Sequence, residues 1–244
     1  MLREMATTYG RSPGGYLWAI LDPLAGVALL TALFSFALRN PPLGTNFALF
    51  YTTGFLPFMA YAELTSKVGA AIRYSRPLLS YPSVSYIDAI LSRLILNFMT
   101  NLVVFIIMIV GIVLLYDLRV ETDPLRLANA VGMLAVLVLG FGTVNCYLFG
   151  AYPVWERIWS IANRPLFFIS GVFFVVDKMP EGFRNMVLYN PLTHVVCEVR
   201  AGFFPTYDAA YVSPLYVYGV GVVSLFFGLL LLYRHNRFLI TEGA

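Results

Sequence analysis

The reactive side chains of this chain offer little for catalysis. Its two histidines, His194 and His235, are far apart in the sequence, and Cys146 and Cys197 lie in segments of different polarity. The chain contains no G-x-x-x-x-G-K-[ST] phosphate-binding loop, no H-E-x-x-H and no C-x-x-C. Those motifs would supply nucleotide binding, metal binding or redox chemistry. The sequence therefore predicts no catalytic residue, no metal site and no cofactor held by this chain itself.

Two carboxylates, Asp22 and Glu63, interrupt otherwise apolar stretches. Ion-coupled carriers place ionisable groups near the middle of the membrane, whereas both of these lie near the ends of their stretches. Lys67 follows Glu63 by four residues, a spacing that predicts an ion pair along one face of a helix. We therefore favour a structural role for Glu63 over transport chemistry.

Aromatic residues make up 16% of the chain and indicate a different kind of chemistry. Tyr51, Phe58 and Tyr61 share one face of a predicted helix, and Trp18 lies one turn before Asp22 in another. Aromatic rings that carry polar groups stack on sugars and hydrogen-bond to their hydroxyls. These four aromatic residues are candidates for lining a glycan path, with packing or lipid contact as the alternative.

The loop 67–93 is the longest predicted cytoplasmic connection and the most basic one. Loops of this length inside a compact domain are usually functional, which predicts a docking element for a cytoplasmic partner. The alternative is a cationic anchor at the lipid surface. An amphipathic stretch, 83–94, closes the loop. The candidate docking residues are Arg73, Tyr74, Arg76, Leu79, Tyr81 and Asp88.

Two other segments are predicted not to cross the membrane. Residues 2–15 predict a short amphipathic helix at the membrane surface, with a frayed tail as the alternative. Residues 178–211 contain two amphipathic pieces broken at Asn190-Pro191, which predict a helical hairpin beside a pore mouth or a subunit interface. A plain surface loop is the alternative. The candidate gate residues of this hairpin are Phe183, Tyr189, Asn190, Pro191, His194 and Glu198.

The composition of the chain indicates the environment in which these segments lie. Of the 244 residues, 59% are hydrophobic and 12% are charged, whereas soluble domains carry about 25% charged residues. We therefore expect a single all-α integral membrane domain. A bilayer crossing needs about 20 apolar residues, and the fifth stretch is short unless residues 158–163 belong to it. Six transmembrane helices are predicted at about 16–38, 46–66, 94–116, 127–152, 158–176 and 214–233.

Cations set the expected orientation. Lys and Arg concentrate in the N-terminal segment, in the loop 67–93 and in the C-terminal tail, whereas the opposite loops mix cations with carboxylates. Cytoplasmic loops retain cations, so both termini are predicted to be cytoplasmic. The net charge of +3 is too small and too dispersed to indicate nucleic-acid binding.

Three stretches together resemble a known family. Arg3-Glu4-Met5 and Tyr9-Gly10-Arg11 precede Gly15-Tyr16-Leu17-Trp18-Ala19-Ile20-Leu21-Asp22-Pro23. These are similar to the N-terminal signature of bacterial capsular-polysaccharide export permeases, the membrane subunits of type 2 ABC transporters, which commonly have Glu at the position of Asp22. The segments 163–171 and 189–196 resemble the family's fifth span and its external Asn-Pro-Leu element. The signature residues are Arg3, Glu4, Tyr9, Arg11, Tyr16, Trp18 and Asp22.

This resemblance implies a specific assembly. It implies a homodimer in the bacterial inner membrane with two separate ATPase subunits, which hold the ATP and magnesium. The loop 67–93 would contain the coupling helix that docks on the ATPase, and 178–204 would form periplasmic re-entrant gate helices. The implied cargo is a lipid-linked capsular polysaccharide, and an envelope-spanning export protein would be a further partner.

Other functions stay open at this point. A type 2 ABC exporter of O-antigen, of a small lipid or of a drug would share the fold and differ in cargo. A membrane-embedded lipid-modifying enzyme would need clusters of acidic or histidine residues, which are not apparent in the sequence. A structural membrane scaffold would not need the basic loop and the external hairpin.

Overall fold

The computed structural model describes residues 15–79 and 85–241, and every regular element in this part of the chain is a helix. This confirms the all-α class. The predicted helix 2–15, with Arg3, Glu4, Tyr9 and Arg11, lies almost entirely outside the described residues, and so does Tyr81. The helices are α2 Gly15–Ala37, α3 Phe47–Gly69, α4 Ala71–Leu79, α5 Tyr86–Leu115, α6 Pro124–Ala151, α7 Pro153–Ile169, the 3₁₀ helix η1 Val176–Lys178, α8 Glu181–Leu188, α9 Pro191–Phe203 and α10 Pro214–Thr241.

Four helices are long and apolar enough to cross a membrane: Leu17–Ala37, Tyr86–Leu115, Pro124–Ala151 and Pro214–His235. Together with the composition, they support an integral membrane protein. The helix α3 has a comparable length of 23 residues, but most of it is buried inside the subunit. The helix α7 has 17 residues and carries charged side chains.

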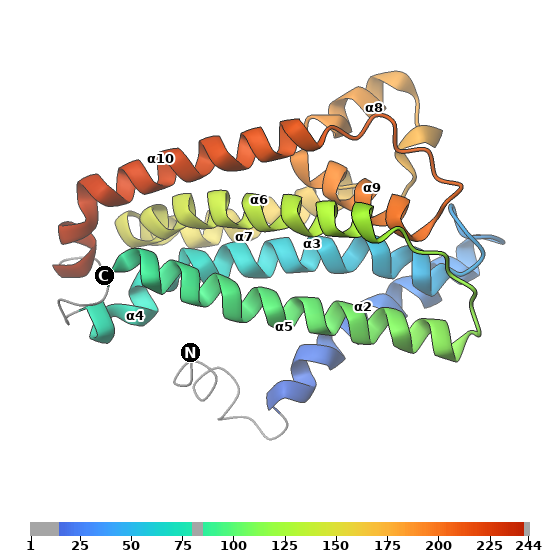
Figure 1. Cartoon of the computed structure of the whole chain (residues 1–244), viewed down its shortest axis with the longest axis horizontal. Helices are drawn as coiled ribbons and strands as arrows, with labels where there is room; N and C mark the ends of the chain where they lie inside the picture. Colours follow the sequence, from blue (N-terminus) through green and yellow to red (C-terminus); the bar gives the residue numbers. More distant parts are fainter. Residues whose placement is uncertain (1–14, 80–84, 242–244) are drawn as a thin grey trace.

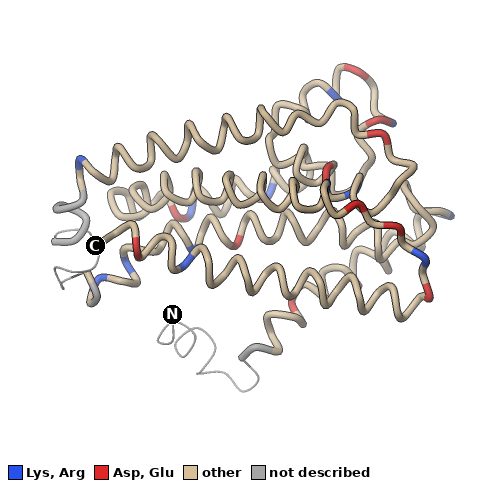
Figure 2. The backbone as a smooth tube through the Cα atoms, viewed as in Figure 1, with Lys and Arg blue, Asp and Glu red and all other residues tan. Residues whose placement is uncertain are grey.

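The long helices lie side by side along the longest axis of the molecule (Figure 1). The helix α6 packs against α10, α3 and α9, and α3 also packs against α5 and α2. The short helix α4 lies at the end of the bundle where α10 ends, whereas α8 and α9 lie toward the opposite end (Figure 1). Charged residues gather toward the two ends of the bundle and are sparse along its middle (Figure 2).

Two helices begin earlier than the sequence predicts. The helix α5 begins at Tyr86 rather than near residue 94, because Ser85 and Asp88 form a capping box that satisfies backbone groups of its first turn. The amphipathic stretch 83–94 is therefore largely the base of α5. The predicted span 158–176 is also displaced: α7 begins at Pro153 and ends at Ile169, and Gly171, with φ of 76°, follows its end.

Glycines allow α6 and α10 to approach closely. A Cβ atom on Gly140 would lie 2.3 Å from the carbonyl oxygen of Gly221, and one on Gly228 would lie 2.8 Å from the backbone nitrogen of Val144. Helices in a membrane gain little from hydrophobic burial, so close backbone packing carries much of their association. The glycines at this contact are therefore required by the packing of the two helices.

We expect Gly140→Ala to destabilise the protein by about 1–3 kcal/mol, because the added methyl group meets backbone that cannot move aside. The matched control is Gly219→Ala on α10, where an added Cβ meets no atom within 4 Å. That substitution should stabilise the helix by up to about 1 kcal/mol. Thermal unfolding of the purified variants measures both effects, and equal midpoints would contradict the packing.

Candidate functional site

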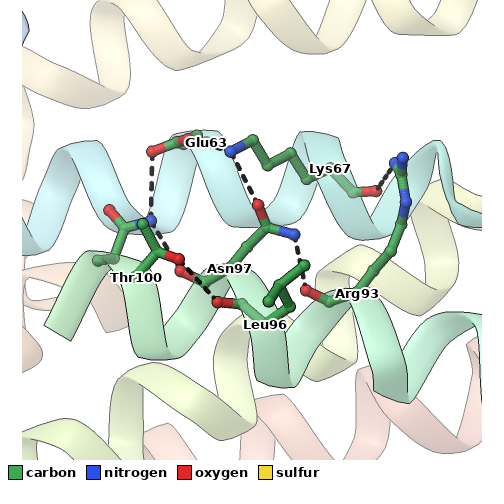
Figure 3. A network of polar contacts seen from close by, with 7 residues as sticks. Glu63, Lys67, Arg93, Leu96, Asn97 and Thr100 are labelled. Atoms are coloured by element: carbon green, nitrogen blue, oxygen red, sulfur yellow. Dashed lines mark hydrogen bonds and ion pairs between the residues drawn. The ribbon is translucent and has the colours of Figure 1, made fainter. Parts of the chain in front are cut away.

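The predicted docking loop contains an elbow between α3 and α4. Only Ala70 separates the two helices. Arg93 of α5 is 6% exposed; its Nη1 donates to the carbonyl oxygen of Lys67 at 3.0 Å, and its Cζ lies 4.2 Å from the centre of the Tyr74 ring. Figure 3 shows the contact of Arg93 with Lys67. Because the same guanidinium also lies over the Tyr74 ring of α4, it joins three helices at the elbow.

A row of polar contacts continues from this elbow along α3 and α5 (Figure 3). Lys67 Nζ pairs with Glu63 at 2.5 Å and donates to Asn97 Oδ1 at 2.9 Å, which confirms the predicted Glu63–Lys67 pair. Asn97 Nδ2 donates to the carbonyl oxygen of Arg93 at 2.8 Å, and Asn101 Nδ2 donates to Glu63 at 3.3 Å. These mutual bonds satisfy polar groups between otherwise apolar helices, and they tie α3 to α5.

Arg73 connects α4 to α7. Its two terminal nitrogens donate to the two carboxylate oxygens of Glu156 at 2.8 and 3.0 Å. The hydrogen bonds from Arg73 lower the pKa of Glu156, and those to Glu156 raise the pKa of Arg73. Both side chains are about half exposed, 47% and 46%, so the pair contributes at most about 1 kcal/mol. Arg73 thus has a partner within the subunit, a contact that the docking prediction did not include.

The other candidate docking residues have varied surroundings. Tyr74 is 64% exposed, although its ring lies over Arg93, whereas Leu79 is buried. Arg76 is half-buried on α4, and Asp88 belongs to the cap of α5. Docking by these residues stays a prediction, and the structure places Tyr74 best for it.

A cavity of about 790 Å³ lies between α2, α3 and α5, with α6 and α9 behind it. Its wall is mostly apolar, but Trp18, Asp22, Glu63, Thr100 and Asn101 also line it. Cavities of this size hold small organic ligands in other proteins. Tyr16 lies in the first turn of α2, just before this cavity begins.

The other predicted glycan-path residues occupy a different place. Tyr51, Phe58 and Tyr61 are 0%, 6% and 4% exposed. Their rings pack inside the subunit, at 5.2 Å from Phe34 for Tyr51 and at 4.9 Å from Phe167 for Phe58. In this conformation they present no face to a ligand at the subunit surface. The helix face that these three residues share is a buried face of α3. Trp18 is 60% exposed, so the prediction of a glycan path applies directly only to this residue.

The external segment forms two short helices that meet at the predicted break. Asn190 caps α9, since its Oδ1 accepts from the backbone nitrogen of Leu192 at 3.0 Å, and its Nδ2 donates to Ser170 Oγ at 3.0 Å. Pro191 begins α9, a position that tolerates its missing N–H. The segment forms two helices in the structure, α8 and α9, whereas a re-entrant hairpin within a bilayer stays a prediction.

The remaining gate candidates divide between surface and interior. Phe183 and Tyr189 are 43% and 79% exposed. His194 is 4% exposed, with Nε2 2.9 Å from the carbonyl oxygen of Leu188, and Glu198 accepts a hydrogen bond from Asn129 at 3.0 Å. The two buried residues brace α9, and the two exposed aromatics are the ones available to a ligand or a neighbouring subunit.

Spacing and composition indicate no special role for Arg200, but in the structure it connects the external hairpin to the segment after α7. The side chain is fully buried and donates to the carbonyl oxygens of Gly171, Val172 and Phe174 at 2.6, 2.8 and 2.8 Å. Its Cζ lies 4.1 Å from the centre of the Phe50 ring. No carboxylate among the described residues pairs with it. The guanidinium therefore holds the non-helical segment after α7 against α9 and α3.

Comparison with known protein families assigns the chain to one of them. The family model for the ABC-2 type transporter matches residues 1–204, which is most of the chain. The chain belongs to the ABC-2 type transporter family. In this ABC-2 protein, the matched region includes the elbow, the polar row, the cavity and the external hairpin.

Several curated proteins are similar to this ABC-2 chain over nearly its whole length. The polysialic acid transport protein KpsM of Escherichia coli is 29% identical over 241 residues, which cover 99% of this chain and 93% of KpsM. The capsule polysaccharide export inner-membrane protein CtrC of Neisseria meningitidis serogroup A is 25% identical over 237 residues, 97% of this chain and 89% of CtrC. The corresponding protein BexB of Haemophilus influenzae is 24% identical, with the same coverage.

We expect Arg200→Lys to destabilise this ABC-2 protein by about 2–4 kcal/mol, because a lysine cannot reach three carbonyl oxygens and leaves buried acceptors without donors. The matched control is Arg119→Lys, since Arg119 is exposed. Thermal unfolding measures the change, and limited proteolysis reports whether 170–175 is released. If both variants unfold at the same temperature, Arg200 does not hold this segment.

The Arg73–Glu156 pair predicts a dependence on pH. Because the pKa of Glu156 is lowered in the folded protein, its contribution is present above the unfolded pKa, about 4.5, and is lost as the pH falls through the lower folded value. We expect Glu156→Gln to lower stability by at most about 1 kcal/mol at pH 7. The difference from the wild type should disappear in acid. A difference that persists at pH 3 in thermal unfolding would mean that the ion pair is not its cause.

Proposed function

We propose that this chain is the membrane permease of an ATP-driven exporter that carries capsular polysaccharide across the bacterial inner membrane. The observation that carries the proposal is near full-length similarity to permeases named for polysialic acid transport and for capsule polysaccharide export. The fold agrees with this role, because the chain belongs to the ABC-2 family and has four helices suited to cross a membrane.

The proposed topology has six spans, formed by α2, α3, α5, α6, residues 158–176 and α10, with both termini in the cytoplasm. Two features support it. The helix α4 lies at the same end of the bundle as the end of α10 (Figure 1), and the cations of the loop 67–93 favour a cytoplasmic location. The hairpin α8–α9 would then lie on the periplasmic side, and residues 2–15 would rest on the cytoplasmic surface.

The proposed assembly is a homodimer of this chain with two copies of an ATPase subunit. This chain has no phosphate-binding loop, so ATP and magnesium would bind to the ATPase. The cargo would be a polysaccharide attached to a lipid, handed on to an envelope-spanning partner. An exporter of O-antigen, a small lipid or a drug would share the fold, but the relatives named above support capsular polysaccharide.

The coupling step follows from the elbow. An ATPase that displaces α4 would also move α5, because Arg93 of α5 stacks on Tyr74 and hydrogen-bonds to the end of α3. The polar row from Lys67 to Asn101 would keep α3 and α5 moving together. Coupling requires two discrete arrangements with different affinities for ATP and cargo, and a rigid three-helix elbow can transmit the change between them.

The central experiment uses liposomes that contain this chain and its ATPase subunit. We expect capsular polysaccharide to enter the lumen only when ATP, magnesium and both subunits are present. The control is an ATPase inactivated in its phosphate-binding loop. Transport that proceeds without ATP hydrolysis would overturn the proposed function.

Coupling itself is tested at the elbow. We expect Arg93→Gln and Tyr74→Leu to reduce the polysaccharide exported per ATP hydrolysed by about fivefold or more, the range of typical coupling energies. Tyr74→Phe keeps the ring and should retain coupling. Tyr116→Leu, at an exposed tyrosine just beyond the other end of α5, is the matched control. An unchanged ratio of export to hydrolysis in both elbow variants would show that Arg93 does not transmit the motion.

A further inference from the structure

The helix α7 is only lightly packed against the rest of the subunit. None of its 17 residues is buried, whereas most of α3 is. Along its middle, aromatic rings make the contacts: Trp159 lies 6.2 Å from Phe141, and Phe167 lies 4.9 Å from Phe58. Apolar contacts have no fixed direction, and packed helices can slide past each other by small distances. The packing of α7 therefore permits a small displacement of the whole helix.

Hydrogen bonds attach the C-terminal end of α7 to the external hairpin. Thr193 Oγ1 donates to the carbonyl oxygen of Ile169 at 3.2 Å. Asn190 Nδ2 donates to Ser170 Oγ at 3.0 Å. The bonds of Arg200 hold the residues that follow. Because hydrogen bonds depend on direction as well as distance, the last turn of α7 and the hairpin α8–α9 move together.

The N-terminal end of α7 is joined to α4 by the ion pair of Arg73 with Glu156. Glu156 lies in the first turn of α7, and both of its carboxylate oxygens accept hydrogen bonds from Arg73. A bidentate pair fixes the relative orientation of its two groups. Both side chains are about half exposed, so water can replace these bonds at little cost. The pair therefore suits a contact that changes during a transport cycle better than a permanent brace.

The helix α7 thus connects the two ends of the bundle. The helices α4 and α9 lie at opposite ends (Figure 1), and the 17 residues of α7 span about 25 Å. On α4, Tyr74 contacts Arg93 of α5, whereas the preceding residue, Arg73, contacts Glu156 of α7. Consecutive residues of an α-helix point about 100° apart. A displacement of α4 therefore acts on α5 and on α7 through different side chains.

We propose that α7 carries the displacement of α4 to the external hairpin, and that the Arg73–Glu156 pair is the contact through which α4 moves α7. This inference rests on the proposed function, because it requires an ATPase that docks at α4. The elbow at Arg93 acts on α3 and α5, and the pair at Glu156 acts on the hairpin. Arg73 and Glu156 are positioning residues, since they act through α7.

The response of the hairpin can be measured in the permease–ATPase complex in lipid nanodiscs. Met186→Cys places a thiol on α8, at a side chain that is 65% exposed. Cys146 and Cys197 are buried, so a water-soluble maleimide labels the introduced thiol selectively. We expect a non-hydrolysable ATP analogue to change the labelling rate by about fivefold or more, the range of typical coupling energies.

The decisive variant is Glu156→Gln, which removes the charge from α7 and leaves the candidate docking residues of α4 in place. We expect it to bind the ATPase and hydrolyse ATP as the wild type does. It should lose most of the labelling response and export about fivefold less polysaccharide per ATP. The matched control is Arg157→Gln, at the exposed next residue of α7, which should keep the full response. An unchanged response in Glu156→Gln would overturn the proposal, because a purely structural pair leaves the response intact.

A second variant separates α7 from the elbow. Arg93→Gln removes the contact of α5 with Tyr74 and leaves the Arg73–Glu156 pair in place. We expect this variant to keep the labelling response at position 186 while it exports less polysaccharide per ATP. If Arg93→Gln loses the response as completely as Glu156→Gln does, the displacement reaches the hairpin through α5, and the role proposed for α7 is wrong.

The two proposals fail in different ways. If the wild-type complex exports polysaccharide with ATP and Glu156→Gln responds as the wild type does, only the role of α7 is wrong. If the wild-type complex does not couple export to ATP, the proposed function is wrong, whatever the labelling rate shows. The export assay in liposomes and the labelling assay in nanodiscs therefore give separate answers.

Discussion

Polar groups in apolar surroundings must find their partners inside the protein, and both ends of this bundle are organised by that requirement. An unsatisfied polar group in hydrocarbon costs several kcal/mol. Arg200 meets the requirement by donating to three backbone carbonyl oxygens, and Arg93 does so through Lys67 and the Tyr74 ring. Each arginine thereby joins segments that are distant in the sequence. The contacts that satisfy each buried guanidinium are thus also the contacts that connect the helices.

Arg200 and Arg93 connect different parts of the fold. At Arg200 the partners are backbone oxygens of one non-helical segment, so the hairpin α8–α9 and the end of α7 form one unit. At Arg93 the partners belong to α3 and α4, so this residue of α5 ties the short helix to two long helices. The close contact of α6 with α10 through Gly140 and Gly221 packs two further long helices tightly together.

The cavity between α2, α3 and α5 lies next to the polar contacts of the elbow. Its carboxylates lie next to the polar row that begins at the elbow, because Glu63 belongs to both. Glu63 therefore joins the wall of the cavity to the contacts between α3 and α5.

The sequence by itself determined the all-helical class, the membrane character, the Glu63–Lys67 pair and the break at Asn190-Pro191. These features depend on local spacing and composition, which a single chain displays directly. Only the tertiary structure decided that Tyr51, Phe58 and Tyr61 are buried, that Arg73 pairs with Glu156, and that Arg200 is a central brace. Helical periodicity tells which residues share a face, but not which neighbour covers that face. The partners of Arg200 and Arg73 lie 26 to 83 residues away along the chain, and such contacts exist only after the helices have packed.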